Sequence, residues 1–184
     1  SLLTCQSPTP FKDNSSNSFT ITLSQTPSAL SYGPFNTSVP ATPTINGMVW
    51  IKDRTTSNNH NLFDTVQKAT KLLQSNSTAA QITDTASLVS FNANGFSLGT
   101  GNTTGSQVNT SADNFVAWTF LKQAKFFDIV SYTGTGSNRT IAHNLGSVPG
   151  CIIVKRTDTT GNWQVYHSGL TSASYSLGLN ATNT

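Results

Sequence analysis

The chain has few charged side chains. They make up 9% of its 184 residues, with 7 acidic and 10 basic positions, against roughly a quarter in an average soluble domain. Basic residues lie close together only at Lys52 with Arg54 and at Lys155 with Arg156, whereas a nucleic-acid-binding surface requires a basic stripe. The net charge of +3 is only the small difference between the numbers of basic and acidic residues. Because a basic stripe is lacking, we expect no binding to nucleic acid.

Long apolar runs and targeting signals are also lacking. No apolar run approaches the roughly 18 residues of a membrane-spanning helix, and no charged segment followed by an apolar stretch opens the chain as a signal peptide would. We therefore expect no membrane insertion. Residues 1–5 look like a strand from the middle of a domain, so we expect both ends of the chain to be cuts in a longer polypeptide.

Cysteine occurs only twice, as Cys5 and Cys151. A disulfide would need their Cα atoms within about 7 Å of each other. Cys151 takes the position of Met48 in the repeat described below, and we interpret that position as part of the core. We therefore expect Cys151 to be a small buried apolar residue.

The titratable residues form no recognisable catalytic or metal-binding pattern. His60, His143 and His167 fall in no H-x-x-x-H or H-x-H arrangement, and the acidic residues are too scattered for a calcium loop. His167 matches Asp64 in the repeat, and a catalytic or ligand role would not survive that exchange. We expect no catalytic residue, metal or cofactor, and interpret Asp64 and Asp128 as turn caps or partners of basic residues.

One stretch of the chain occurs twice. Three segments recur with apolar on apolar and aromatic on aromatic, the first two 103 positions apart and the third 104: residues 47–52 and 150–155, 59–64 and 162–167, 73–78 and 177–182. Tandem repetition is typical of extended structural proteins and uncommon in metabolic enzymes. We therefore expect a tandem array of one domain type, with the second copy ending before its final strands.

Short strands account for most of the remaining pattern. We predict them where residues alternate with period two or form short apolar runs between turns: residues 19–23, 48–52, 60–66, 88–91, 96–98, 115–121, 126–132 and 140–144. The run 115–121 is the most apolar and is expected to be a central core strand. Residues 65–74 have helical spacing, but the matching segment 168–179 is rich in Ser and Gly, so we predict strand or loop there.

These strands, with their Gly and Asn turns, predict an all-β fold of antiparallel β-sandwich or jelly-roll-like units in tandem, the second truncated. We place the N-terminal strands and linker, the end of an upstream module, at residues 1–43. The first repeat then covers 44–125 and the second, incomplete repeat covers 126–184. We expect the cores to be built by large apolar residues of both units: Trp50, Phe63, Phe115, Trp118, Ile129, Ile153 and Val165.

Two aromatic residues are candidate glycan contacts. Trp163 and Tyr166 flank the second predicted hairpin, and Trp163 takes the position of His60 in the first copy, which suggests an exposed place. An aromatic face offers apolar area to a sugar ring. The alternative, which we favour, is that Trp163 packs at the tip of the hairpin.

Several segments together point to a family: residues 47–54, 60–66, 75–78, 91–99, 115–120, 127–134, 143–146 and 149–150. They resemble a repeat of structural proteins in marine, cyanophage-like tailed phages. Residues 3–6 and 13–16 resemble the end of a laminin-G/concanavalin-like module. The resemblance implies a virion protein in a tail fibre or capsid-attached fibre, and it offers no catalytic residues to carry over.

We therefore predict a non-enzymatic virion structural protein, a homotrimeric tail-fibre or capsid-fibre module that contacts other virion proteins and attaches to a host-surface glycan. One alternative is a capsid decoration or adaptor protein, which would bind the shell. Another is a carbohydrate-binding module. A depolymerase enzyme is a further alternative, and it would need a carboxylate cluster in a groove, which the sequence does not supply.

Overall fold

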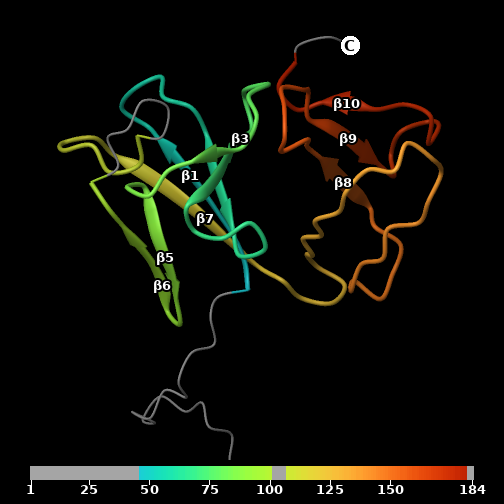
Figure 1. The fold of residues 1–184 in the computed structure, drawn as a ribbon, viewed down its shortest axis with the longest axis horizontal. Coiled ribbons are helices and arrows are strands. Elements are labelled where there is room, and N and C mark those ends of the chain that lie inside the picture. The colour runs from blue at the N-terminus through green and yellow to red at the C-terminus, as the bar shows by residue number, and fades with distance from the viewer. Residues whose placement is uncertain (1–45, 101–106, 182–184) are drawn as a thin grey trace, which may run out of the picture. The chain divides into compact units, whose positions relative to one another are not determined.

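The computed structural model describes residues 46–100 and 107–181. Cys5, the strand predicted at 19–23 and the module-like N-terminal segments lie outside the described residues. The described part contains strands in antiparallel pairs and no helix (Figure 1). The predicted all-β class is therefore confirmed, while the division into tandem sandwich units stays a prediction.

The larger sheet has five strands in the order β4-β3-β2-β1-β7. Its members are β1 (Gly47–Asp53), β2 (Asn61–Asp64), β3 (Lys71–Gln74), β4 (Ile82–Thr83) and β7 (Phe115–Leu121). Predicted runs cover β1, β2 and β7, whereas β4 was not predicted. Strand β1 alternates buried and half-buried residues along its whole length, because successive side chains of a strand point to opposite faces and only one face is covered. The β1–β2 hairpin is confirmed, and β3 confirms strand within residues 65–74.

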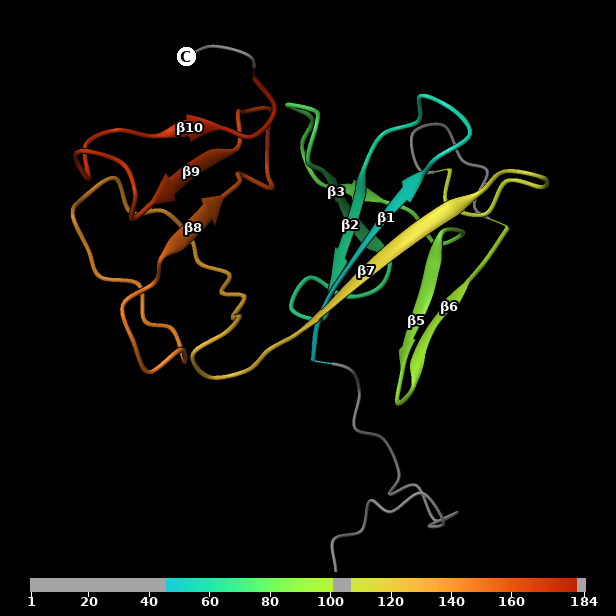
Figure 2. The same ribbon diagram turned by 180° about the vertical axis from the view of Figure 1, so that it is seen from behind.

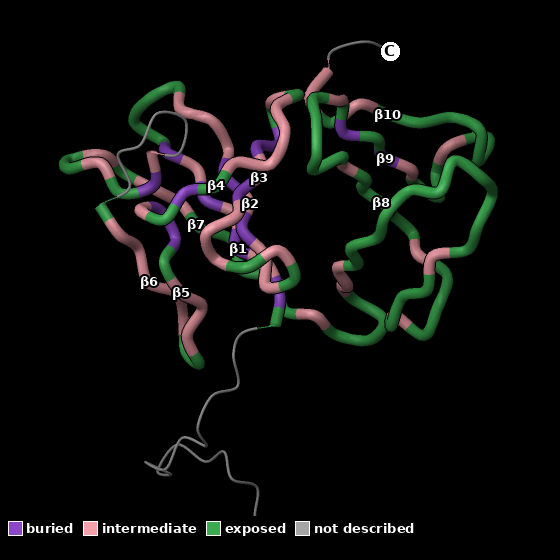
Figure 3. Tube along the Cα trace, in the orientation of Figure 1, coloured by how far each residue is buried: buried purple, intermediate pink, exposed green. Residues whose placement is uncertain are grey.

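A hairpin of β5 (Leu88–Asn92) and β6 (Gly95–Leu98) supplies the apolar side chains that cover the sheet. The buried core consists of residues from the sheet, the hairpin and one loop: Val49, Ile51, Phe63, Leu72, Leu88 and Val108. Val108 lies in the connection between β6 and β7. Figure 3 shows the buried residues gathered along β1, β2 and β3.

Strand β7 corrects one prediction. It is a strand, but it lies at the edge of the sheet, paired with β1 alone, and most of its residues are exposed (Figure 2). Trp118 is 45% exposed, and Trp50 lies directly opposite it in the register, on the face away from the buried Val49 and Ile51. These two tryptophans are therefore not core residues, although Phe63 and Phe115 are found where predicted.

The smaller sheet has three strands in the order β10-β9-β8. They are β8 (Cys151–Val154), β9 (Gln164–His167) and β10 (Leu177–Gly178). Val165 is buried as predicted, whereas Cys151 and Ile153 are exposed, because no second layer covers either face of β8 among the described residues. The core roles predicted for Cys151 and Ile153 are therefore wrong.

The segment between the two sheets contains none of the predicted strands. Residues 126–132 and 140–144 form no strand, and only an isolated bridge joins Gln123 to Phe127. Side-chain contacts hold this segment instead: the Asp128 carboxylate accepts hydrogen bonds from the backbone N–H groups of Ile129 (2.9 Å) and Asn144 (2.7 Å). An alternating pattern makes a strand only where a partner strand lies beside it.

Candidate interaction surface

The three-stranded meander β1–β2–β3 is repeated as β8–β9–β10. Residues 103 positions apart in the first two strands, and 104 in the third, pair in the same register: Met48–Asp64 and Cys151–His167, Val49–Phe63 and Ile152–Tyr166, Leu62–Leu73 and Val165–Leu177. The extra residue falls between the second and third strands, where the sequence alignment places it. The internal similarity in the sequence thus corresponds to the same strand pairing in both meanders.

An asparagine clasp closes each meander. In both copies the asparagine after the third strand accepts a hydrogen bond from the backbone N–H before the second strand, and donates one to the asparagine beside it. The bonds are His60 N to Asn76 Oδ1 (3.0 Å) and Asn76 Nδ2 to Asn59 Oδ1 (2.8 Å), then Trp163 N to Asn180 Oδ1 (2.8 Å) and Asn180 Nδ2 to Asn162 Oδ1 (3.0 Å). Sequence reasoning missed these residues, although their recurrence at the repeat spacing marks them.

The turn after the second strand is also the same in both copies. Asp64 Oδ1 accepts hydrogen bonds from the backbone N–H groups of Val66 (2.8 Å) and Gln67 (2.7 Å), which confirms the predicted turn cap. His167 Nδ1 accepts one from Gly169 N (3.0 Å). A neutral imidazole nitrogen can replace the carboxylate oxygen as an acceptor, so the exchange of Asp for His preserves a structural role.

Trp163 does not face solvent. It is only 5% exposed, and its indole Nε1–H donates to the backbone carbonyl of Gln74, at the end of β3 in the first copy (2.9 Å). Gly161 N also donates to Thr78 O (2.9 Å). The candidate glycan contact at Trp163 is therefore wrong, because the hairpin tip packs against the first copy and buries the ring. The alternative packing role is confirmed.

The other candidate glycan contact, Tyr166, is half-buried on β9. It pairs with Ile152 in the register and therefore lies on the same face of the small sheet as Ile152 and Val154. Gln164, opposite Val154, is the polar residue of β9 on this face, and the structure does not bring Tyr166 together with Trp163.

A different set of aromatic side chains lies at the surface of the large sheet. Trp50 and Trp118 are opposite each other, with ring centroids 6.0 Å apart and planes at 72°. Trp50 also lies edge-on to His60 at 5.7 Å and donates its Nε1–H to His60 Nδ1 (3.0 Å). We call Trp50, Trp118 and His60 the outer aromatic face. Sequence reasoning missed it because the tryptophans were assigned to the core.

Hydrogen bonding fixes the outer aromatic face in one arrangement. Because His60 Nδ1 accepts the indole proton, that nitrogen must be unprotonated. Partial burial, with a contribution from the Lys52 ammonium, lowers the pKa of His60 below its ordinary value of 6.5. The neutral acceptor is therefore the form present at neutral pH, and Trp50 supports the more exposed ring of Trp118 as a firm apolar surface.

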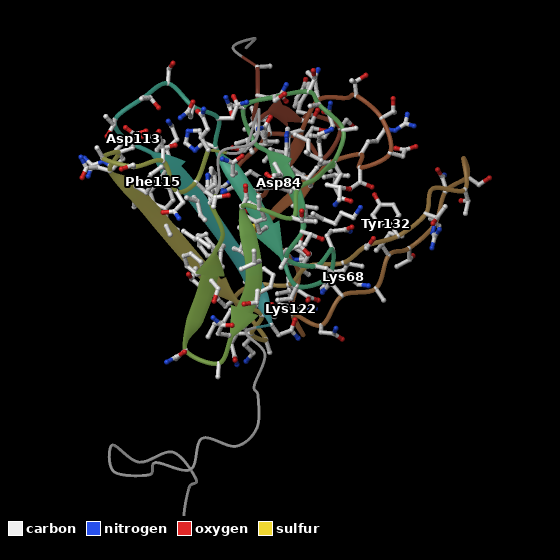
Figure 4. The ribbon with its side chains drawn as sticks, turned by 60° about the vertical axis from the view of Figure 1, so that its left-hand side comes forward. Lys68, Asp84, Asp113, Phe115, Lys122 and Tyr132 are labelled. Carbon is white, nitrogen blue, oxygen red and sulfur yellow. The ribbon has the colours of Figure 1, made fainter. Side chains whose placement is uncertain are left out.

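Asp53, Asp64 and Asp84 hold turns by accepting hydrogen bonds from backbone N–H groups two residues further along the chain. Burial raises the pKa of Asp53, but hydrogen bonds from Thr56, Thr55 and Asn58 outweigh that effect and hold the pKa well below its usual range. Figure 4 shows Asp113 beside Phe115 at the start of β7 and Lys122 at its other end. Among residues 46–100 and 107–181, no group of three or more His, Cys, Asp or Glu side chains could hold a metal ion.

The ion pair between Lys122 and Asp128 links the end of β7 to the following segment. The Lys122 ammonium lies 2.9 Å from the Asp128 carboxylate, and both side chains are largely buried. Lys122 also donates to the backbone carbonyl of Ile129 (3.3 Å). These contacts order the connection between the two meanders.

No helix long and apolar enough to cross a membrane occurs in the part of the chain that the structure describes. No curated protein and no solved structure matches the chain. A family described as a domain of unknown function, DUF7483, matches residues 34–184. The match runs through both meanders and the segment that joins them. The chain belongs to the DUF7483 family.

Proposed function

We propose that this chain is a non-enzymatic structural module of a virion surface fibre, in which repeats pack head to tail and present an aromatic face to a host-surface glycan. One observation carries the proposal: the hairpin tip of the second meander packs on the end of the third strand of the first, through the Trp163–Gln74 bond. A contact between different surfaces of equivalent units leaves one such surface free at each end, so further units can add by the same contact and form an array when the rotation between units does not close a ring.

Composition and resemblance support the virion location. A surface with few charges, rich in hydroxyl and amide groups, suits an extracellular or virion protein, and the repeated segments resemble those of marine tailed-phage structural proteins. Homotrimer formation and contacts with other virion proteins remain part of this proposal. Both a tail fibre and a capsid-attached fibre agree with it.

The outer aromatic face supports glycan attachment. Trp118 is accessible and Trp50 braces it from the neighbouring strand, which is the firm apolar platform that a sugar ring can cover. For this reason the second candidate function is a carbohydrate-binding module. It places the same chemistry on the large sheet without requiring an array.

The location is tested by cryo-electron microscopy of the intact virion whose genome encodes the chain. We expect density for repeated β-units in a fibre attached to the tail or the capsid. Density lying flat on the capsid shell would contradict host attachment and would instead support a decoration or adaptor protein. A virion without the chain would exclude the structural role.

Glycan binding is tested with the Trp118→Ala variant on immobilised polysaccharide from the host surface. Removing a stacking partner that contributes about 0.5–1.5 kcal/mol should weaken binding by about 2- to 10-fold. Tyr175→Ala is the matched control, since Tyr175 is exposed but lies away from the outer aromatic face. Equal binding by the wild type and Trp118→Ala would remove this face as the glycan site.

A further inference from the structure

The two meanders differ in what lies beside their first strand. In the first copy, β1 lies between β2 and β7, and all seven of its residues pair with β7. In the second copy, β8 pairs with β9, and no strand lies along its other edge among the described residues. The second copy therefore has an open position where the first copy has β7.

The open edge presents main-chain hydrogen-bonding groups. Ser168 N donates to Gly150 O (2.8 Å), so Gly150 and, by alternation along the strand, Ile152 and Val154 direct their N–H and C=O groups toward β9. The residues between them, Cys151 and Ile153, direct theirs to the other side. No partner for these groups is found on the described part of the chain.

In the first copy, the backbone groups equivalent to those of Cys151 and Ile153 bind a neighbouring strand. There Thr65 N donates to Gly47 O (3.0 Å), as Ser168 does to Gly150, and the alternate residues face β7. At one end of that pairing Lys122 N donates to Asn46 O (2.7 Å). The backbone of β8 has the same phase as that of β1, and so it is set to accept the same kind of strand.

Besides the open edge of β8, one face of the small sheet also lacks the cover that its counterpart in the first meander has. The residues that form the buried core on the first meander are Val49, Ile51 and Phe63. Their equivalents in the second meander are Ile152, 42% exposed, Val154, 39% exposed, and the half-buried Tyr166. In the first copy the β5–β6 hairpin and Phe115 of β7 supply the cover. An exposed apolar strand with a free edge invites pairing with another chain.

We propose that the edge of β8, with the face formed by Ile152, Val154 and Tyr166, is an acceptor site for one extended strand with the chemistry of β7. The occupant is a strand supplied by a partner chain, and it runs antiparallel to β8. By the register of β1 with β7 it places a Phe opposite Arg156 on the apolar face and a Trp opposite Ile153 on the other. Main-chain bonds give such strand addition its affinity, and alternate side chains give its specificity.

The occupant is a separate segment rather than β7 of a second copy. Every residue of β7 already pairs with β1 along one edge, so offering that edge to β8 of another copy would unpair β1 in the donor. Pairing through the other edge of β7 would instead be seen as self-association. The inference also stands apart from glycan attachment, because it concerns the small sheet and no residue of the outer aromatic face.

The test adds a synthetic peptide with the sequence of residues 113–123 to the full chain and measures hydrogen exchange of the β8 amides. We expect exchange at Cys151 and Ile153 to slow by about 10-fold or more at saturating peptide. Labelling of the Cys151 thiol, in a Cys5→Ser background, should slow with it. A peptide with Pro at the position of Trp118 lacks a strand N–H and should protect neither group.

Three results would overturn the proposal. The first is no protection by the peptide, and the second is equal protection by the Pro control. The third is protection of Cys151 and Ile153 in the chain alone, from self-association seen by sedimentation or from residues 1–43 seen by cross-linking. A chimera that carries a copy of residues 79–121 after Thr184 gives a second readout, in which the same two amides become protected without added peptide.

Discussion

Replacing Trp163 by Ala should detach the second meander from the first while leaving the large sheet folded. The ring is 5% exposed, and burying a tryptophan removes about 150–250 Å² from water, worth roughly 4–6 kcal/mol at about 25 cal/mol per Å². The Nε1 hydrogen bond to Gln74 O adds about 0.5–1.5 kcal/mol. Truncation of a buried aromatic residue typically costs about 3–5 kcal/mol, and we take that range because the site can partly collapse.

The loss should be local, because Trp163 is the largest buried side chain of the small sheet. Hydrogen exchange measured by mass spectrometry should show faster exchange in residues 150–181, by two orders of magnitude or more, since about 1.4 kcal/mol corresponds to a factor of ten. Exchange in β1 and β2 should stay unchanged. Trp163→Phe, which removes the hydrogen bond but keeps most of the apolar area, should fall between the wild type and Trp163→Ala.

The control is Tyr175→Ala, since Tyr175 is 61% exposed and should leave exchange in both meanders unaltered. Two results would refute the reasoning. Equal loss of protection in both meanders would mean that the chain unfolds as one cooperative unit. Unchanged exchange in residues 150–181 would mean that the indole does not hold the small sheet in place.

Two further predictions concern the free energy of unfolding. Phe63→Ala should lower it by about 3–5 kcal/mol in urea denaturation, whereas Tyr166→Ala should lower it far less, because Tyr166 is only half-buried at the equivalent position. Equal losses would show that the second apolar face is already covered. The hydrogen bond from Lys122 and those from backbone N–H groups lower the pKa of Asp128 below its ordinary 3.8, so its contribution is complete above that pH and is lost as the pH falls through the lowered value. Asp128→Asn should therefore be less stable by about 1–3 kcal/mol near neutral pH, and the difference should vanish in strong acid; a constant difference at all pH values would contradict the ion pair as its cause.

The local sequence pattern predicted strands correctly where a neighbouring strand is present to pair with them. It failed where no such strand lies beside the segment. The β1–β2 hairpin follows from an apolar run, a polar turn and a second run, which are local features. Residues 126–132 have the same kind of pattern but form no strand, because pairing depends on what lies beside them. Sequence alone does not contain that information when the neighbour is distant along the chain.

The site residues show the same limit more sharply. Trp118 was assigned to the core because it lies in the most apolar run, yet β7 is an edge strand and its Trp faces outward. Analogy with His60 suggested an exposed place for Trp163, whereas the favoured interpretation was packing at the hairpin tip, and the ring is buried. Hydrophobicity predicts that a tryptophan ring tends to be buried, but it does not determine which part of the chain, if any, packs against the ring.

The presence of His60 in the first meander and of Trp163 at the equivalent position in the second explains how the two meanders differ in their contacts. In both copies the backbone at this position is held by an asparagine clasp, so the side chain can vary without disturbing the strands. In the first copy the imidazole accepts a hydrogen bond from Trp50 and completes the outer aromatic face. In the second copy the indole instead donates to the carbonyl of Gln74 and joins one meander to the other. A single substitution at a fixed backbone position thus converts a surface residue into an interface residue, which is how a repeat can specialise while its fold stays the same.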